Sequence, residues 1–279
     1  MPSVHSTAVI VPGATLHDDV TVGPFCVVGA GVEVGPGTRL LANVTMFGPM
    51  RLGARNVVHP FAVLGGDPQH RDYHGETTHL EIGDDNVFRE HVTVHRGTVE
   101  GGAMTRIGSG CLLMAGTHVA HDATLGDRVT LTNGTLLGGH VRIGDWVVAA
   151  GHVAVAPFAR VGTSAFLAGN AMVERDVPPF MIAAGDRATL RAVNRVGLTR
   201  RNVPEASRVA IKQAFHKIFA REGERFDVVG PEADRIARDP FVAQLVAFLR
   251  EPSRLGLLAR HRAAHGAHGA QTVRSTRSS

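Results

Sequence analysis

The chain contains 279 residues, with a formal net charge of +4 and a sequence pI of about 9.8. Its lysines and arginines concentrate after Arg187, so the basic pI does not describe a nucleic-acid surface spread over the whole protein. No stretch approaches the roughly 20 consecutive apolar residues of a membrane span, and the N-terminus lacks the pattern of a secretory signal. We therefore expect a cytoplasmic protein that neither binds nucleic acid nor spans a membrane.

Aromatic residues make up only 5% of the chain, whereas glycine occurs 33 times, so the core must be aliphatic and the backbone must turn often. The two cysteines, Cys26 and Cys111, cannot form a disulfide framework and lack the local spacing of a zinc site. We interpret both as small core residues.

Apolar residues recur at every sixth position in three runs of the sequence. The runs are Ile10, Leu16, Val22, Val28, Val34, Leu40, Met46, Leu52, Val58 and Leu64, then Ile82, Phe88 and Val94, then Ile107, Leu113, Val119, Leu125, Leu131, Leu137, Ile143, Ala149, Val155, Val161, Leu167 and Val173. A second, usually small apolar residue lies four positions after many of these, and glycine often follows the first. Neither helical periodicity nor a long alternating strand explains this pattern.

The spacing resembles the hexapeptide repeat of left-handed parallel β-helices, in which three hexads form one triangular coil of about 18 residues. The predicted fold class is an all-β left-handed parallel β-helix over residues 1–185, with a small C-terminal α-helical domain. The handedness rests on the resemblance, since ordinary parallel crossovers are right-handed. Two loop insertions, residues 66–78 and residues 100–106, interrupt the rhythm, and insertions of this kind commonly carry binding loops.

The helical domain is expected over residues 186–258. Pro204 and Glu205 open a segment predicted to be a helix ending at Gly223, and Asp239 followed by Pro240 predicts the N-cap and first turn of another. Such helices would cover the last coil, whose edge would otherwise be unpaired. Residues 259–279 lack apolar periodicity and are rich in small residues, His and Arg, so we expect a disordered tail.

The densest polar cluster inside the repeat consists of His118, His121 and Asp122. Because the residues between and after them occupy inward hexad positions, these side chains must lie at the outer surface or at a corner. One coil of about 18 residues later, Gly139 should stack over His121 and His140 over Asp122. The sequence thus predicts one patch with three imidazoles, a carboxylate and an unobstructed backbone amide.

Two kinds of chemistry compete for this patch. Three histidines can bind zinc between subunits, as in the γ-class carbonic anhydrases, which share the predicted fold. Alternatively, His121 removes a hydroxyl proton as a general base while Asp122 orients the imidazole and the Gly139 N–H receives the developing oxyanion. A third interpretation is that these histidines are merely solvated side chains without a chemical role, since the chain has 16 histidines.

Longer motifs resemble the UDP-N-acetylglucosamine acyltransferase family from about residue 3 to residue 250. They are VGPFCVVG at 22–29, FREHVTVHRGT at 88–98, HVAHDATLG at 118–126, LGGHVRIGD at 137–145 and DVPPFMIAAGD at 176–186. The motifs HRGT and HVAHD together indicate this family far more specifically than the hexads do. The resemblance implies that His121 is the catalytic base, Asp122 its orienting partner and Gly139 the oxyanion donor.

The resemblance also implies a set of binding residues. Those for the substrate and its nucleotide are His95, His118, His140, Gln69, His70, Asn194, Arg200 and Arg201. Gly169 matches the residue that sets acyl length, and its missing side chain predicts a 3-hydroxyacyl chain of about 14 carbons. The sequence departs from the family pattern at His70, Asp72, Ala156, Pro157 and Arg187. These departures leave open a variant acceptor, such as a 3-amino sugar.

The implied reaction is attack by the 3-hydroxyl of UDP-N-acetylglucosamine on the thioester of an acyl chain held by acyl carrier protein, the first step of lipid A synthesis. No metal or cofactor is expected. The acidic carrier would meet basic residues of the helical region, and the candidates are Arg201, Arg208, Lys212, Lys217 and Arg221.

We expect a homotrimer, because the outer face of a single coil offers no concave pocket for substrates. The hexads begin at Ile10, which leaves no room for the separate N-terminal uridine-binding domain of the related N-acyltransferase. A non-catalytic hexapeptide scaffold is a further alternative, and it should lack the HVAHD and HRGT motifs.

Overall fold

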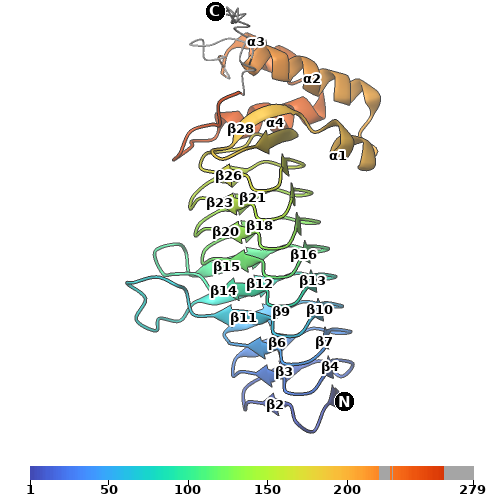
Figure 1. Ribbon diagram of the computed structural model, residues 1–279, viewed down its shortest axis with the longest axis vertical. Coiled ribbons are helices and arrows are strands. Elements are labelled where there is room, and N and C mark those ends of the chain that lie inside the picture. The colour runs from blue at the N-terminus through green and yellow to red at the C-terminus, as the bar shows by residue number, and fades with distance from the viewer. Residues whose placement is uncertain (220–226, 228, 261–279) are drawn as a thin grey trace, which may run out of the picture.

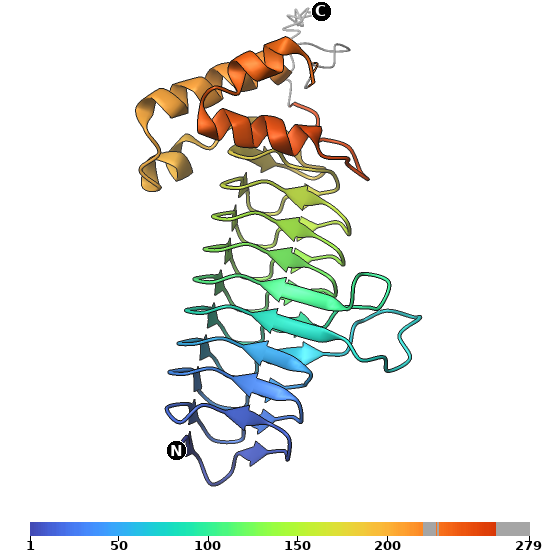
Figure 2. The ribbon, with the colours of Figure 1, turned by 180° about the vertical axis from the view of Figure 1, so that it is seen from behind.

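The computed structural model describes residues 1–219, 227 and 229–260, which form a long triangular prism capped by helices at one end (Figure 1). The prism is the predicted left-handed parallel β-helix. Short strands follow one another around three flat faces, and strands one coil apart pair in parallel up to β27. Figure 2 shows the same stack from behind, with the N-terminus at the end opposite the helices.

Three sheets, called A, B and C below, make up the faces. Sheet A contains β1 (Ser3–Val4), β4 (Thr21–Val22), β7 (Arg39–Leu40), β10 (Val57–Val58), β13 (Val87–Phe88), β16 (Leu112–Leu113), β19 (Thr130–Leu131), β22 (Val148–Ala149), β25 (Phe166–Leu167), β27 (Met181–Ala184) and β28 (Thr189–Val193). Sheet B contains β2 (Val9–Ile10), β5 (Val27–Val28), β8 (Thr45–Met46), β11 (Val63–Gly66), β14 (Thr93–His95), β17 (His118–Val119), β20 (Leu136–Leu137), β23 (Ala154–Val155) and β26 (Met172–Val173). Sheet C contains β3 (Thr15–Leu16), β6 (Val32–Val34), β9 (Met50–Leu52), β12 (His79–Ile82), β15 (Met104–Ile107), β18 (Thr124–Leu125), β21 (Arg142–Ile143) and β24 (Arg160–Val161).

The hexad residues form the core of the prism. Val28, Leu64, Leu113 and Leu167 are fully buried, and both cysteines are buried as expected. Each coil places an apolar side chain directly above its equivalent in the previous coil, because the parallel register pairs Val58 with Phe88 and the other hexad positions likewise. Burial of a Leu or Val side chain stabilises a fold by about 1.5–3 kcal/mol, so this continuous apolar column dominates the stability of the prism.

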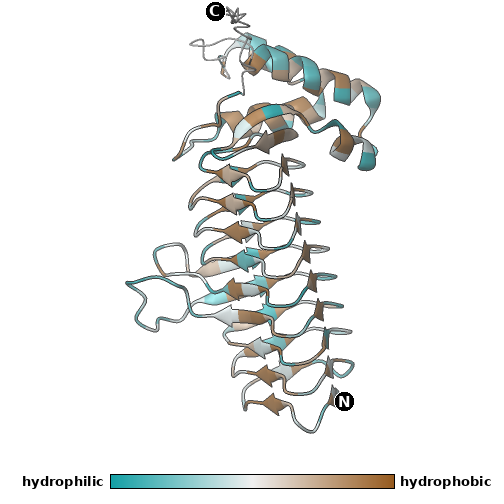
Figure 3. Ribbon diagram, in the orientation of Figure 1, coloured by the Kyte–Doolittle hydropathy of each residue, from teal (hydrophilic) through white to brown (hydrophobic). Residues whose placement is uncertain are grey.

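The outward-facing residues of the three sheets differ in polarity, and Figure 3 colours each residue of the ribbon by its hydropathy. On sheet C the outward residues are mainly charged: Glu33, Arg51, Glu81, Arg106 and Arg142. On sheets A and B they are mainly apolar: Val57, Val87, Leu112, Val148 and Phe166 on sheet A, and Val9, Val27, Val63, Leu136 and Met172 on sheet B. Only one face of the prism therefore has the composition of a solvated surface.

Two loops project from the corner between sheets B and C, near the middle of the prism (Figure 1). The first joins β11 to β12 and covers residues 67–78, whereas the predicted insertion spans residues 66–78; Gly66 still belongs to β11 and pairs with His95. The second joins β14 to β15, and β15 begins at Met104. The insertion predicted over residues 100–106 is therefore misplaced at both ends. The loop covers residues 96–103, because β14 ends at His95 and Met104, Thr105 and Arg106 pair with β12.

The last coil ends in the antiparallel pair β27 and β28, over which the helices pack. These are α1 (Arg195–Arg200), α2 (Glu205–Phe219), α3 (Pro231–Ile236) and α4 (Pro240–Arg250). Asp239 is the N-cap of α4, as predicted, and its carboxylate accepts hydrogen bonds from the backbone of Phe241 and Val242. Gly223, the predicted end of α2, lies outside the described residues, as does most of the predicted tail.

Candidate active site

The polar cluster lies at the corner between sheets B and C, called corner BC. Its turns are residues 120–123, 138–141, 156–159 and 174–177. Asp122 and His140 occupy equivalent positions one coil apart, with φ of 62° and 60°. The His140 N–H donates to the carbonyl of His121 at 3.0 Å, and the Asp122 N–H donates to Thr105 Oγ1 at 2.7 Å. These hydrogen bonds hold the two positive-φ turns in place. His140 therefore lies one coil above Asp122, as predicted.

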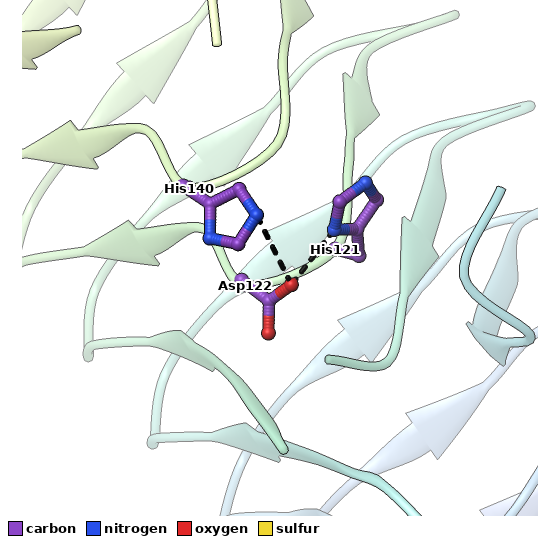
Figure 4. A group of neighbouring side chains, drawn as sticks. All are labelled: His121, Asp122 and His140. Carbon is purple, nitrogen blue, oxygen red and sulfur yellow. Dashed lines mark hydrogen bonds and ion pairs between the residues drawn. The ribbon is translucent and has the colours of Figure 1, made fainter. Parts of the chain in front are cut away.

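His121 and Asp122 form a hydrogen-bonded pair at this corner (Figure 4). His121 Nδ1 lies 2.7 Å from Asp122 Oδ2, and His140 Nε2 lies 3.7 Å from the same oxygen. His121 and Asp122 are only 9% and 7% exposed. With the carboxylate accepting at Nδ1, the second ring nitrogen of His121 carries the lone pair, which is the tautomer that a general base needs.

The loop before β15 holds Asp122 in place. Thr98 donates twice to the carboxylate, from its backbone N–H to Oδ1 at 2.8 Å and from its hydroxyl to Oδ2 at 2.7 Å. Burial raises the pKa of the Asp122 carboxyl, but the hydrogen bonds from His121 and Thr98 outweigh burial and leave that pKa below its usual value. A Cβ at Gly101 would lie 2.1 Å from the carboxylate carbon of Asp122, so the loop needs glycine there.

Gly139 lies against the imidazole of His121. A Cβ at this position would lie 2.7 Å from His121 Cε1, so any side chain would displace the ring. The Gly139 N–H donates to no residue in the described part of the chain, whereas the amides of Gly138 and His140 are both used in the coil. This amide is therefore available to a bound group beside His121, as the oxyanion role requires.

Three further predicted residues surround the pair. The rings of His70 and His121 lie 5.3 Å apart, and those of His95 and His118 lie 5.2 Å apart. His118 Nδ1 lies 2.8 Å from Thr93 Oγ1. Burial, together with the neighbouring His95 and His121, lowers the pKa of His118, which favours its neutral form.

The loop between β11 and β12 carries His70 and the exposed Gln69 beside this corner. Arg96, which is 6% exposed, donates hydrogen bonds to Gly65, Asp67 and Tyr73 and so holds the base of the loop in place. Three of the four residues of HRGT thus have a partner that their side chains contact: His95 contacts Asp67, Arg96 holds the loop, and Thr98 holds Asp122. The sequence marked this motif as specific but did not reveal what Arg96 and Thr98 contact.

Four predicted residues lie at other corners of the prism. Asn194 is buried, caps α1 and donates to the carbonyl of Ser164, while Arg201 donates to the Ser164 hydroxyl. Ser164 belongs to the corner between sheets C and A, called corner CA, whose turns include residues 144–147 and 162–165. Arg200 is exposed at the end of the same helix. Within one chain, these residues are not part of the His121 site.

Gly169 is exposed at the third corner, between sheets A and B, called corner AB, with turns that include residues 150–153 and 168–171. A Cβ there would meet only ordinary contacts, 3.5 Å from the Gly151 carbonyl oxygen and 4.0 Å from Ala150. The position therefore has room for a side chain, and glycine is not required by packing.

One group of side chains in the described ranges has the geometry of a metal site. The ligand atoms of His121, Asp122 and His140 all lie within 4.8 Å of one another. His118, which the zinc hypothesis included, is instead bonded to Thr93. Both carboxylate oxygens of Asp122 already accept hydrogen bonds from Thr98, so this donor set fits an orienting carboxylate better than a metal ligand.

Comparison with known proteins identifies the class to which the chain belongs. Residues 3–48 and 104–139 match the bacterial transferase hexapeptide model, which covers six repeats. Residues 176–258 match the model described as UDP-N-acetylglucosamine O-acyltransferase, domain 2. The fold and these matches define a hexapeptide-repeat acyltransferase.

Solved structures narrow the class further. UDP-N-acetylglucosamine O-acyltransferase from Moraxella catarrhalis is 32% identical, with a TM-score of 0.88 over 91% of this chain and 99% of that one. LpxA from Acinetobacter baumannii is 35% identical, with a TM-score of 0.86 over 91% and 99%. The Francisella novicida UDP-N-acetylglucosamine acyltransferase is 30% identical, with a TM-score of 0.88 over 98% and 100%. The chain belongs to the UDP-N-acetylglucosamine O-acyltransferase family, as the motifs indicated, and is an O-acyltransferase enzyme of the lipid A pathway.

The alternative functions gain no support from these matches, neither the variant acceptor nor the carbonic anhydrase-like zinc protein. None of the helices in the described part of the chain is long and apolar enough to cross a membrane.

Proposed function

We propose that this chain transfers a 3-hydroxyacyl group from acyl carrier protein to the 3-hydroxyl of UDP-N-acetylglucosamine in the cytoplasm, with His121 as the general base. The observation that carries this proposal is the 2.7 Å hydrogen bond between His121 Nδ1 and Asp122, next to the unused backbone amide of Gly139. The arrangement supplies a base, a group that orients it and an oxyanion donor within one corner.

The reaction follows from these three groups. His121 Nε2 takes the proton of the sugar hydroxyl while the hydroxyl oxygen attacks the thioester carbon. The Gly139 N–H donates to the oxygen that becomes negative in the tetrahedral intermediate. When the C–S bond breaks, the imidazolium, stabilised by Asp122, returns the proton to the departing thiolate. The ester and the free thiol of the carrier are the products.

A homotrimer explains how the remaining predicted residues reach this site. Sheets A and B expose apolar side chains, such as Leu136, which is 50% exposed, whereas sheet C is charged. Three prisms can bury both apolar faces if corner AB of each points to a three-fold axis and sheet B packs against sheet A of the neighbour. Sheet C then faces solvent in every subunit.

In this trimer, corner BC of one subunit meets corner CA of the next. Asn194, Arg200 and Arg201 of the neighbour would then stand beside His121, and a guanidinium fork suits a diphosphate. His118, His140, His95, Gln69 and His70 would contact the sugar from the first subunit. Gly169 lies at the inner edge of the same sheet B, so an acyl chain crossing the interface from His121 would pass it.

We place the carrier protein at the helical end, in the region of residues 186–258. The exposed basic side chains of Arg200 and Lys212, with the half-buried Arg208, favour an acidic partner. Lys217 is already paired with Glu232, and Arg221 lies outside the described residues. The β-helical part, residues 1–185, would then supply the chemistry and the helical part the donor contact.

The direct test is to incubate the purified protein with UDP-N-acetylglucosamine and a panel of 3-hydroxyacyl carrier proteins, and to identify the product by mass. A 3-O-acylated nucleotide sugar is expected, and acylation at nitrogen or no product with any donor would contradict the proposal.

The two-chain site has its own test. Homotrimers of His121→Ala and of Arg201→Ala should both be poorly active, but trimers refolded from a mixture should regain activity in roughly a quarter of their sites. A mixture no more active than its components would show that each site belongs to a single chain.

A further inference from the structure

Corner BC carries a stack of side chains that continues from the His121 site toward the helical end. The rings of His140 and Phe158 lie 4.4 Å apart with only 6° between their planes. The guanidinium carbon of Arg254 lies 3.6 Å from the centroid of the Phe158 ring. Arg254 comes from the segment after α4, almost a hundred residues away in the sequence, so only the folded chain brings it to this corner.

The segment that carries Arg254 is held firmly against the prism. Arg160 donates to the carboxylates of Asp176 at 2.8 Å and Glu251 at 2.9 Å. The Asp176 N–H donates to the Gly256 carbonyl at 2.9 Å, and the Leu258 N–H donates to the Asp176 carbonyl at 3.0 Å. The position of Arg254 over Phe158 is therefore fixed from both sides.

No residue in the described part of the chain neutralises the charge of Arg254. Arg160 is paired with Asp176 and Glu251, and Arg187 with Glu174, but Arg254 makes no ion pair with any residue that the structure describes. Arg175 stands beside the same segment, with its Nη1 3.7 Å from where a Cβ of Gly256 would be. Both side chains are exposed, so their guanidinium groups remain free to bind an anion.

We infer that Arg254, supported by Arg175, forms a phosphate subsite at corner BC for one of the two phosphate-bearing substrates. This inference rests on the proposed function. Phe158 lies two coils above Asp122, about 10 Å along the prism at the usual spacing of neighbouring strands, and Arg254 stacks on its ring. Both the diphosphate of the nucleotide sugar and the phosphate of the carrier's phosphopantetheine arm would approach this corner when their reacting groups meet at His121. Stacking on Phe158 leaves the donor edge of the guanidinium free for such an anion.

The test separates the two sources by steady-state kinetics. We would compare wild type with Arg254→Ala and Arg254→Lys, and use Arg142→Ala on the charged sheet C as the matched control. Each enzyme is assayed with 3-hydroxyacyl carrier protein, with the same acyl group on pantetheine lacking phosphate, and with UDP-N-acetylglucosamine as the varied substrate.

If Arg254 binds the carrier's phosphate, Arg254→Ala raises the KM of the carrier substrate roughly 5- to 20-fold and leaves that of acyl-pantetheine unchanged. If it binds the diphosphate, the KM of UDP-N-acetylglucosamine rises by a similar factor for every donor. Arg254→Lys recovers part of the loss in either case. Unchanged KM values for both substrates, or a fall in kcat alone through the His140 stack, would overturn the inference.

Equilibrium binding gives an answer that does not depend on turnover. Calorimetric titration of wild type and Arg254→Ala with UDP and with 4′-phosphopantetheine should show weaker binding of one of them to the variant. Equal affinities for both probes would overturn the phosphate subsite even if the wild type proved inactive, which would count against the proposed function alone.

Discussion

Thr98→Val removes the hydroxyl that donates to Asp122 while keeping the volume of the side chain nearly constant. The lost hydrogen bond is 2.7 Å long, charge-assisted and buried, and contacts of this kind contribute about 1.5–3 kcal/mol. Because the Thr98 N–H and His121 still contact the carboxylate, we take the lower end of that range. If this free energy is lost from the stabilisation of the transition state, kcat falls about tenfold.

The assay is initial-rate acyl transfer at saturating acceptor, with KM measured for both substrates. We expect kcat to fall while both KM values stay within about twofold, since Thr98 would touch neither substrate and would act only through Asp122. Thr124→Val, on the solvated sheet C, is the control and should match wild type. Wild-type kcat in Thr98→Val, or an equal loss in the control, would refute the reasoning.

Four further predictions concern catalysis, assembly, stability and specificity. His121→Ala should lower kcat by roughly 10²–10⁴ with little change in melting temperature, and near-normal turnover, or loss of wild-type activity on adding a zinc chelator, would contradict the proposed base. Leu136→Glu should break the trimer by light scattering and abolish activity, whereas the matched Thr124→Glu on sheet C should change neither; a fully active monomer would contradict the two-chain site. Because the folded chain lowers the pKa of His118, it binds this proton less readily than the unfolded chain, so stability should fall as pH drops below about 6.5; His118→Gln should flatten that loss in melting curves. Gly169→Met should shift donor preference from about 14 carbons to a shorter chain, and an equal loss for all lengths would show that Gly169 does not set acyl length.

The local pattern of the sequence was enough to predict the prism and the pairing of His121 with Asp122. A repeat that places an apolar residue at every sixth position fixes the length of a coil, and residues 18 positions apart then stack through parallel pairing, as His118 does with Leu136. His121 and Asp122 are neighbours in the chain, and Gly139 and His140 follow them by one coil. Their juxtaposition needed no knowledge of distant contacts.

Contacts between segments far apart in the sequence were decided only by the tertiary structure. Thr98 reaches Asp122 through a loop whose length does not follow the repeat, so no register rule could place it. Arg254 reaches Phe158 because Arg160 and Asp176 hold the segment after α4, and Arg160 and Glu251 are 91 residues apart. Asn194 and Arg201 lie at a different corner from His121 because the chain enters α1 from the last coil on the side of sheet A. A repeat determines what lies one coil away, whereas insertions and the helical cap follow no period, and their packing alone decides which side chains complete the site.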